Sequence, residues 1–392
     1  MIGLATFKGW PYRNAIGPTR SFNYSIEPQV IRARKLTYFN KTKSQEIDVP
    51  ISSCPVFIGD NLIVASDDGY VQLFDKDLEN ILWKKRVLGS PYAPLMIHGN
   101  PPHVLITTTN GIVASYSLKG ELAWETKLQS GILGTPLEIT SGVLAITQHN
   151  GYLFFLSGET GSLISSVYLP CSGKWPMRSI SLVRDPYSSP ISGTQGVIIA
   201  RGSDVFSINS ENFEIQWKAE LGGLQKATLA YDPKTRLIFA ANCDGSLYIL
   251  DESSGEVVDV ISFGEKMISS PAIINGVLVF SSLGGKLRGL DILKRNILWV
   301  RDSSVEGYTS IVPINNSKVC FINRRASLEC VDISSGCFYW ETSEVLGIPD
   351  HDSKVDTTPV FSKGGLVVST SYSGYICLYE FGEANAATES SR

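Results

Sequence analysis

The sequence lacks long hydrophobic runs. None of its stretches reaches the roughly eighteen consecutive apolar residues that a membrane-spanning helix requires, although the chain has 392 residues. The first ten residues, Met1 to Trp10, do not place a long apolar segment behind a charged start, which argues against a secretory signal. These absences predict a soluble cytoplasmic protein without a transmembrane segment.

Histidine is scarce and cysteine is scattered. The four histidines do not lie at the spacing of metal ligands. The seven cysteines are odd in number and never form C-x-x-C, which argues against a disulfide framework and a zinc site. We therefore expect reduced, mostly buried thiols, no metal site and no cofactor.

The sequence also lacks the short motifs of common enzymes and the charge of a nucleic-acid-binding protein. It contains no G-x-G-x-x-G, P-loop, G-x-S-x-G or H-E-x-x-H, so nucleotide use and the standard hydrolase classes have no support. The formal net charge is −4, which gives no reason to expect nucleic acid or an anionic membrane as partner.

What the sequence does contain is a repeat with a strand-forming composition. It has 35 glycines, 16 tyrosines and 16 phenylalanines. Each copy reads as small residues with proline, an apolar run, a glycine turn, a second apolar run, an Asp-Gly or Ser-Gly turn and often tryptophan. The turn glycines Gly69, Gly111 and Gly151 are 42 and 40 residues apart, and Gly245 precedes Gly285 by 40.

Five tryptophans share one position in the repeat. Each lies 13 or 14 residues after the turn position of its copy. A shared offset across five copies indicates one structural role, so we expect these side chains to be buried between neighbouring units rather than to line a channel. They are Trp83, Trp124, Trp217, Trp299 and Trp340.

Each copy predicts four short strands. In the first copy, Pro55 opens one apolar run, a run from Asn61 meets the turn Asp68-Gly69, a third run begins at Tyr70, and the fourth carries the tryptophan. Four strands at a period of about 40–45 residues form a propeller blade. The sequence therefore predicts an all-β fold, an eight-bladed β-propeller of four-stranded blades. The expected blades span 49–87, 88–128, 129–169, 170–221, 222–263, 264–302, 303–344 and 345–381.

The eighth copy lacks its outermost strand. A strand-like segment, 29–39, precedes the first blade, and we expect it to complete blade eight and close the ring. The expected organisation is an N-terminal segment at 1–28, a single propeller domain at 29–381 and a disordered tail at 382–392.

At these repeats the chain resembles the pyrroloquinoline-quinone-type repeat family, the quinoprotein alcohol dehydrogenase-like superfamily of eight-bladed propellers. The best-matching segment runs from Asp244 to Gly255, and the segment from Gly9 to Arg20 resembles the opening of these propellers. The resemblance covers nearly the whole chain and implies the fold. It does not imply a chemistry, because the repeated residues make turns and blade contacts.

That superfamily includes quinone-dependent dehydrogenases and scaffolds for the assembly of outer-membrane proteins. For the dehydrogenases the resemblance implies an adjacent cysteine pair, a calcium-binding Glu/Asn/Asp set and a catalytic Asp, and this chain has no adjacent cysteine pair. The scaffold lipoproteins need a signal peptide with a lipidated cysteine, which the sequence does not display. We therefore expect neither activity to transfer directly.

Two histidines are candidates for acid–base chemistry. His149 lies in the expected second-to-third-strand turn of blade three, where it is either an ordinary turn residue or an acid/base group at the channel mouth. His351 lies between Asp350 and Asp352 in a segment that interrupts the repeat before blade eight. Flanking carboxylates raise the pKa of a histidine, so His351 and Asp352 could exchange a proton with a ligand; the alternative is a solvated polar loop.

The connection that enters blade four also departs from the repeat. Trp175 lies off the shared tryptophan position, between Lys174 and Arg178. An exposed aromatic ring beside two cations could stack on and pair with an anionic aromatic ligand, or the segment could form a plug over the ring.

A third departure is Arg324-Arg325, which replaces the Asp-Gly turn of blade seven. In a propeller, the connections between blades and the second-to-third-strand turns emerge on one face. We therefore expect all these irregular residues to gather on one rim. The expected ligand-binding residues are Lys174, Trp175, Arg178, Arg324, Arg325 and Asp350.

The sequence leaves two functions open. We favour a non-catalytic binding or scaffold propeller, a monomer that uses one rim and the central funnel for a protein or small ligand. The alternative is a propeller enzyme acting in the funnel, either similar to quinone-dependent oxidoreductases or biosynthetic. Whether the protein is an enzyme is not decided by the sequence.

Deletion of residues 1–40 tests the expected ring closure. The truncated chain is expected to have a strongly lowered melting temperature, because losing the outer strand of blade eight exposes two sheet edges and opens the ring. Thermal unfolding of the truncated and full-length chains side by side measures the effect. An unchanged melting temperature would show that this segment does not close the ring.

Overall fold

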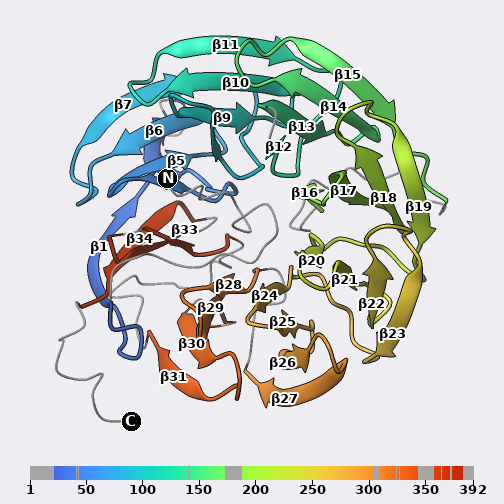
Figure 1. Cartoon of the computed structure of the whole chain (residues 1–392). Coiled ribbons are helices and arrows are strands. Elements are labelled where there is room, and N and C mark those ends of the chain that lie inside the picture. Colours follow the sequence, from blue (N-terminus) through green and yellow to red (C-terminus); the bar gives the residue numbers. More distant parts are fainter. Residues whose placement is uncertain are drawn as a thin grey trace.

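The computed structural model describes residues 22–40, 42, 44–139, 142–172, 188–303, 309–323, 325, 327–342, 357–362, 364–370 and 373–382. Within these residues the chain is all β, and its strands form eight four-stranded antiparallel sheets and one two-stranded sheet. The eight sheets are arranged as blades around a central axis (Figure 1). The predicted eight-bladed propeller is confirmed.

Each blade is a meander whose strands run from the axis outwards in chain order, except in blade eight. The strands of blades one to four are β4 (Val56–Ile58), β5 (Asn61–Ala65), β6 (Tyr70–Phe74) and β7 (Ile81–Arg86); β8 (Met96–His98), β9 (His103–Thr107), β10 (Ile112–Ser117) and β11 (Leu122–Lys127); β12 (Leu137–Ile139), β13 (Val143–Thr147), β14 (Tyr152–Ser157) and β15 (Leu163–Tyr168); β16 (Ile191–Ser192), β17 (Gly196–Arg201), β18 (Asp204–Asn209) and β19 (Ile215–Glu220). Those of blades five to eight are β20 (Ala230–Asp232), β21 (Leu237–Ala241), β22 (Ser246–Asp251) and β23 (Val257–Ser262); β24 (Ala272–Ile274), β25 (Val277–Ser281), β26 (Lys286–Asp291) and β27 (Asn296–Asp302); β28 (Val312–Pro313), β29 (Lys318–Ile322), β30 (Leu328–Asp332) and β31 (Phe338–Glu341); β32 (Val360–Phe361), β33 (Leu366–Thr370), β34 (Tyr375–Glu380) and β1 (Gln29–Lys35).

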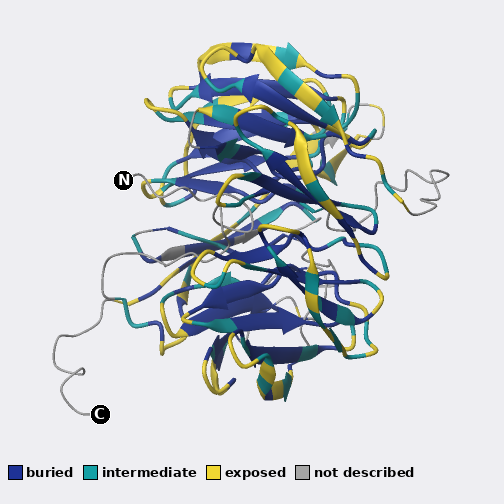
Figure 2. Ribbon diagram, turned by 45° about the vertical axis from the view of Figure 1, so that its right-hand side comes forward, coloured by how far each residue is buried: buried dark blue, intermediate teal, exposed yellow. Residues whose placement is uncertain are grey.

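The core lies between the blades. Figure 2 shows buried residues running through the inner strands, whereas exposed residues lie in the loops and on the outermost strands. In blade one, four of the five residues of β5 are buried, and every residue of β7 is exposed or half-buried. Buried residues of neighbouring blades share clusters, as Ile63 of blade one and Val104 of blade two do. Burial of these apolar surfaces is the main favourable term for folding.

The second-to-third-strand turns require glycine because the connection to the next blade passes directly over them. Gly69 has a φ of 86°, and a Cβ atom there would lie 2.8 Å from the carbonyl oxygen of Val87. The amide of Val87 donates to the carbonyl of Gly69 at 2.8 Å. The turn and the connection that leaves β7 therefore lie on one face of the ring.

The ring is closed by the first strand. β1 pairs antiparallel with β34 from Gln29 opposite Glu380 to Lys35 opposite Tyr375. The prediction that the N-terminal segment completes blade eight is confirmed, but the strand ends at Lys35 rather than at residue 39. The amide of Leu36 donates to the carbonyl of Gly374 at 2.8 Å, as Val87 does to Gly69, so the chain leaves the sheet here.

The residues after this exit form a separate hairpin. β2 (Thr37–Asn40) pairs with β3 (Gln45–Asp48), and the amide of Val49 returns to the carbonyl of Leu36 at 3.0 Å. The hairpin is thus an insertion in the connection from blade eight to blade one.

The five repeat tryptophans link consecutive blades. Three are buried, two are half-buried, and none is exposed, which confirms the predicted location. Each indole Nε1–H donates to a backbone carbonyl on the other side of the contact between two blades, at 2.8–3.0 Å. The pairs are Trp83 with Leu118, Trp124 with Gly158, Trp217 with Glu252, Trp299 with Ile333, and Trp340 with Tyr24.

We call the contact between two neighbouring blades a seam. In four of the seams that contain a tryptophan, the turn that receives the indole carries a glycine with positive φ. A Cβ atom at any of the four would lie under 3.0 Å from the ring, so a larger residue would displace the tryptophan. They are Gly120, Gly161, Gly255 and Gly336. In the fifth seam, blade eight has no such turn, and the N-terminal segment with Tyr24 takes its place.

The three seams without a tryptophan have a larger residue in the turn. At the tryptophan position, β15 has Ser165, and the facing turn has Phe213, whose ring lies 4.4 Å from that of Phe155. β23 has Asp259, which pairs with Arg295 at 3.7 Å.

The last of these seams joins blade eight to blade one. At the tryptophan position β1 has Arg32, which pairs with Glu79 at 2.6 Å, next to the buried Leu78. Tryptophan and glycine are therefore replaced together, because the volume between two blades is shared.

A second set of contacts joins the blades near the axis. A proline or another apolar residue leads into the first strand of each blade. In six blades the residue before it is serine or threonine. In four seams, a backbone amide at this position donates to the side-chain hydroxyl at the same position of the next blade, at 2.9–3.1 Å. The pairs are Thr135 with Ser189, Ser189 with Thr228, Thr228 with Ser270, and Ser310 with Thr358.

The pairing of tryptophan with glycine is tested by giving the contact between blades four and five the residues of the contact between blades three and four. Gly255→Phe is expected to lower the free energy of unfolding by about 3 kcal/mol through overpacking and backbone strain, and Trp217→Ser by roughly 3–5 kcal/mol through a cavity. The double variant, which reproduces Ser165 and Phe213, is expected to lose clearly less than the sum. Urea unfolding of the four proteins measures this cycle.

The matched control is Gly264→Phe. Gly264 also has a positive φ, of 69°, but nothing lies within 4 Å of the place that a Cβ atom would occupy there. It therefore reports the backbone strain alone. Additive losses in the double variant would show that the two residues do not share one space.

Candidate functional site

The site predicted from the sequence depends on one face of the ring, which we call the rim. It consists of the second-to-third-strand turns and the connections between blades. Backbone hydrogen bonds tie the two together around the ring, as between Leu128 and Gly111, Leu169 and Gly151, and Phe263 and Gly245. The turns with His149 and Arg325 lie between β13 and β14 and between β29 and β30, so both belong to the rim.

His149 is exposed in a tightly held turn. Its amide donates to the carbonyl of Gly131 at 3.0 Å. Arg201 of blade four lies over the neighbouring Gly151, donates to the carbonyl of Leu169, and stacks on the ring of Tyr168 at 5.2 Å. These contacts fix the backbone of the turn that carries His149.

Arg325 belongs to a polar cluster of blade seven. Its guanidinium donates to Glu341 at 2.7 Å, and the side-chain amide of Asn323 donates to the same carboxylate at 2.7 Å. Glu329 lies beneath them, where burial raises the pKa of its carboxyl group against the opposing effect of Arg301 at 3.3 Å. Most of the Arg325 side chain remains exposed and can contact a partner.

The other predicted site residues lie outside the described residues. They are Lys174, Trp175, Arg178, Arg324, Asp350, His351 and Asp352. Their meeting across the channel mouth therefore stays a prediction.

The start of the connection into blade four is described. The backbone amide of Ser172 donates to the carboxylate of the fully buried Asp204 at 2.5 Å. Lys218 pairs with the same carboxylate at 3.2 Å and donates to the hydroxyl of Ser172. The chain therefore leaves Ser172 at the rim, two residues before Lys174.

The sequence analysis missed a charged cluster at the rim of blade six. Glu265 accepts from Ser282 and pairs with Lys286 and with the buried Arg288, both at 3.3 Å. The hydrogen bond from Ser282 is the main cause that holds the pKa of Glu265 below its usual range. Lys286 and Arg288 lie 21 and 23 residues after Glu265, and only the register of the blade brings these charges together.

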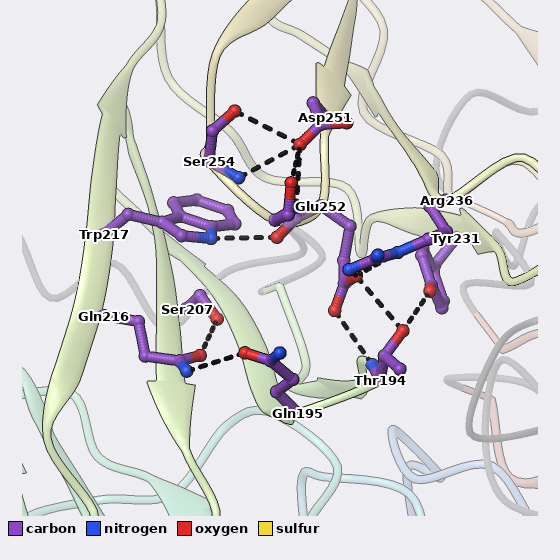
Figure 3. A network of polar contacts seen from close by, with 11 residues as sticks. Thr194, Gln195, Ser207, Gln216, Trp217, Tyr231, Arg236, Asp251, Glu252 and Ser254 are labelled. Carbon is purple, nitrogen blue, oxygen red and sulfur yellow. Dashed lines mark hydrogen bonds and ion pairs between the residues drawn. The ribbon is translucent and has the colours of Figure 1, made fainter.

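A further network lies on the opposite face, between blades four and five (Figure 3). The buried Glu252 accepts from Arg236 at 2.8 Å and from the amide and hydroxyl of Thr194 at 2.9 and 3.1 Å. Thr194 also meets the hydroxyl of the buried Tyr231 at 2.7 Å. Charge-assisted hydrogen bonds hold both oxygens of this carboxylate, so the network clamps two blades together.

His98 is the buried histidine of the described chain. Its Nε2 meets the hydroxyl of Ser115 at 2.9 Å, and its Nδ1 has no partner. Burial is the main cause that lowers the pKa of His98 to about 4, and the nearby His103 adds to it. His98 ends β8 on the face opposite the rim, so it does not belong to the predicted site.

The described residues contain no cluster of three or more His, Cys, Asp or Glu side chains that could hold a metal ion. Nor does this part of the chain include a helix with the length and apolarity needed to cross a membrane.

Comparison with known proteins gives a consistent family. The family model described as outer membrane protein assembly factor BamB matches residues 40–260 and 201–391. The outer membrane protein assembly factor BamB of Yersinia pestis is 20% identical over 337 residues, which cover 82% of this chain and 72% of the relative. That of Moranella endobia (strain PCIT) is 21% identical over 333 residues, 82% of this chain and 73% of the relative.

Solved structures share the fold. BamB from Moraxella catarrhalis aligns with a TM-score of 0.68 at 15% identity, over 91% of this chain and 100% of that one. The designed protein Ika8 gives 0.65 at 15% identity, over 85% and 96%. The quinohemoprotein alcohol dehydrogenase ADHIIG from Pseudomonas putida HK5 gives 0.66 at 12% identity, over 97% and 80%. The predicted resemblance to quinoprotein-like propellers is confirmed.

The prediction of a cytoplasmic protein is wrong. Both curated relatives are outer membrane protein assembly factors. That prediction rested on the lack of an apolar segment at the start of the sequence, whereas the family match begins at residue 40.

The buried His98 predicts a pH dependence of stability. An unfolded histidine has a pKa near 6.5, and that of His98 in the folded chain is about 4. The unfolded state therefore binds the proton more readily, and stability is lost as the pH falls from about 6.5 to about 4, by up to about 3 kcal/mol. Urea unfolding at several pH values is expected to show this loss, and His98→Asn is expected to reduce it.

His103→Asn is the control. His103 is half-buried at the neighbouring strand end and pairs with His98 in the sheet register. The His103→Asn variant should still show most of the loss of stability at low pH that the wild type shows. An identical pH profile for wild type and His98→Asn would show that His98 does not cause it.

Proposed function

The chain belongs to the family described as outer membrane protein assembly factor BamB, and from this premise we propose that it is a non-catalytic scaffold that binds a partner protein at the rim. The partner is a component of an outer membrane protein assembly machinery. The observation that carries the proposal is the family match across residues 40–391, because both curated relatives are named as assembly factors.

The geometry of the rim supports a protein partner. Its polar side chains are held by ion pairs and hydrogen bonds in blades four, six and seven, so little side-chain freedom is lost on binding. Arg325 extends beyond its pair with Glu341 and is mostly exposed. Arginine is enriched in protein interfaces because its guanidinium group forms bidentate pairs with carboxylates and also stacks on aromatic rings.

Residues outside the described part of the chain complete the proposed surface. We include Lys174, Trp175, Arg178, Arg324 and Asp350 as partner contacts. Support comes from Ser172, which Asp204 and Lys218 hold at the rim two residues before Lys174. His149, His351 and Asp352 are proposed to contribute polar contacts, and the chain is proposed to act as a monomer.

Site-specific photo-crosslinking in the native host tests the proposal. A photoreactive residue is placed at His149 or Arg325 on the rim, or at Glu211 or Leu293 in exposed third-to-fourth-strand turns of the opposite face. Adducts with a component of the assembly machinery, identified by mass spectrometry, are expected from the rim positions alone. Adducts from the opposite face alone would contradict the proposal.

Two variants extend the test to the predicted contacts. Trp175→Ala and Arg178→Ala are expected to weaken partner binding by about tenfold or more, because aromatic and arginine anchors often contribute about 2 kcal/mol or more to an interface. Their melting temperatures should match that of the wild type. Unchanged binding by both variants would remove this segment from the proposed surface.

A further inference from the structure

Two buried cysteines face each other in blade seven. Cys320 of β29 lies directly opposite Cys330 of β30 in the register of the two central strands. Both side chains are fully buried and belong to one hydrophobic cluster, so they point to the same side of the sheet. The two thiols are therefore neighbours, although they lie ten positions apart in the sequence.

The hydrogen-bond pattern shows which kind of pair this is. The amide of Asn323 donates to Ser327 across β29 and β30, whereas the carbonyl of Lys318 accepts from Ile314 on the other side of β29. Hydrogen bonding alternates along a strand, so Cys320 bonds away from β30 and forms a non-hydrogen-bonded pair with Cys330. In such pairs the Cα atoms lie about 4.5 Å apart, within the range of roughly 4.4–6.8 Å that a disulfide spans.

The thiols face the seam between blades seven and eight. Their cluster includes Trp340, which pairs with Cys330 in the sheet, and Tyr24 of the N-terminal segment. The indole of Trp340 donates to the carbonyl of Tyr24 at 3.0 Å. This seam is the one in which the tryptophan binds the N-terminal segment rather than a turn.

We propose that Cys320 and Cys330 are a redox-active pair that forms a disulfide across the centre of blade seven when this seam opens. The oxidant is a small disulfide of the glutathione class. The thiolate of one cysteine attacks the oxidant to give a mixed disulfide and one released thiol. The second cysteine then attacks the protein sulfur and releases the other thiol. Two electrons and two protons pass from the protein thiols to the two released thiols.

Burial makes the closed state unreactive. It raises the pKa of both thiols, so the thiolate needed for exchange is scarce while the seam is closed. The reaction rate then follows the fraction of molecules in which the seam is open. A disulfide that crosses adjacent strands lies at the short end of the usual Cα separation, and strained disulfides are the more easily reduced ones. The pair is therefore reversible.

The test uses a full-length parent variant in which the three cysteines that are not buried, Cys171, Cys243 and Cys337, are replaced by serine. Incubation with oxidised glutathione is expected to remove two hydrogen atoms from the intact mass without adding glutathione. Peptide mapping is expected to join Cys320 to Cys330. A permanent glutathione adduct, a link to Cys54 or Cys377, or no reaction in the folded protein over many hours would overturn the proposal.

The role of the seam is tested with matched tryptophan variants of the same parent. Trp340→Phe removes the hydrogen bond to Tyr24 and is expected to speed disulfide formation roughly threefold to tenfold, the factor that corresponds to the net free energy of one hydrogen bond. Trp299→Phe removes the equivalent bond to Ile333 between blades six and seven. It should leave the rate near that of the parent. Equal acceleration by both variants would show that general destabilisation controls the reaction.

Discussion

The structure depends on the space shared between neighbouring blades. The outer strand of one blade and the last turn of the next meet in a volume that holds one large side chain. Trp217 fills it above Gly255, whereas Phe213 fills it opposite Ser165. Close packing explains this exclusion, because two large residues would overlap and two small ones would leave a cavity. Each blade is thus fitted to its neighbour, and the fold is held by seams more than by any single blade.

This constraint also explains what the sequence could reveal. The strands, the glycine turns and the buried tryptophans were predictable, because each follows from residues within one repeat. The closing strand was predictable because blade eight visibly lacks an outer strand. The pair of Asp259 and Arg295 was not, since its members lie in different repeats and look like ordinary surface charges. The early end of the closing strand at Lys35 was missed for the same reason, because the turn at Gly374 determines it from the far end of the chain.

The candidate site was likewise predictable only where it depends on residues within one repeat. Placing His149 and Arg325 on one rim needed only the position of a turn within the repeat. The cluster of Glu265, Lys286 and Arg288 needed the register of the blade and the path of a connection, which a single sequence does not display. The cellular location was predicted wrongly because it was inferred from an absence at the start of the chain. Relatives of known role corrected it.

The first strand is synthesised long before the strand with which it pairs. β1 begins at Gln29 and pairs with β34, which ends at Glu380. At a synthesis rate of about 5–20 residues per second, β1 waits roughly 20–70 seconds for its partner while the blades between them form. A waiting strand with free edges invites aggregation, and positive charge suppresses it. The cations Arg32, Arg34 and Lys35 within seven residues of this strand reduce that risk, and in the folded ring they contact Glu79, the Leu78 carbonyl and Asp48.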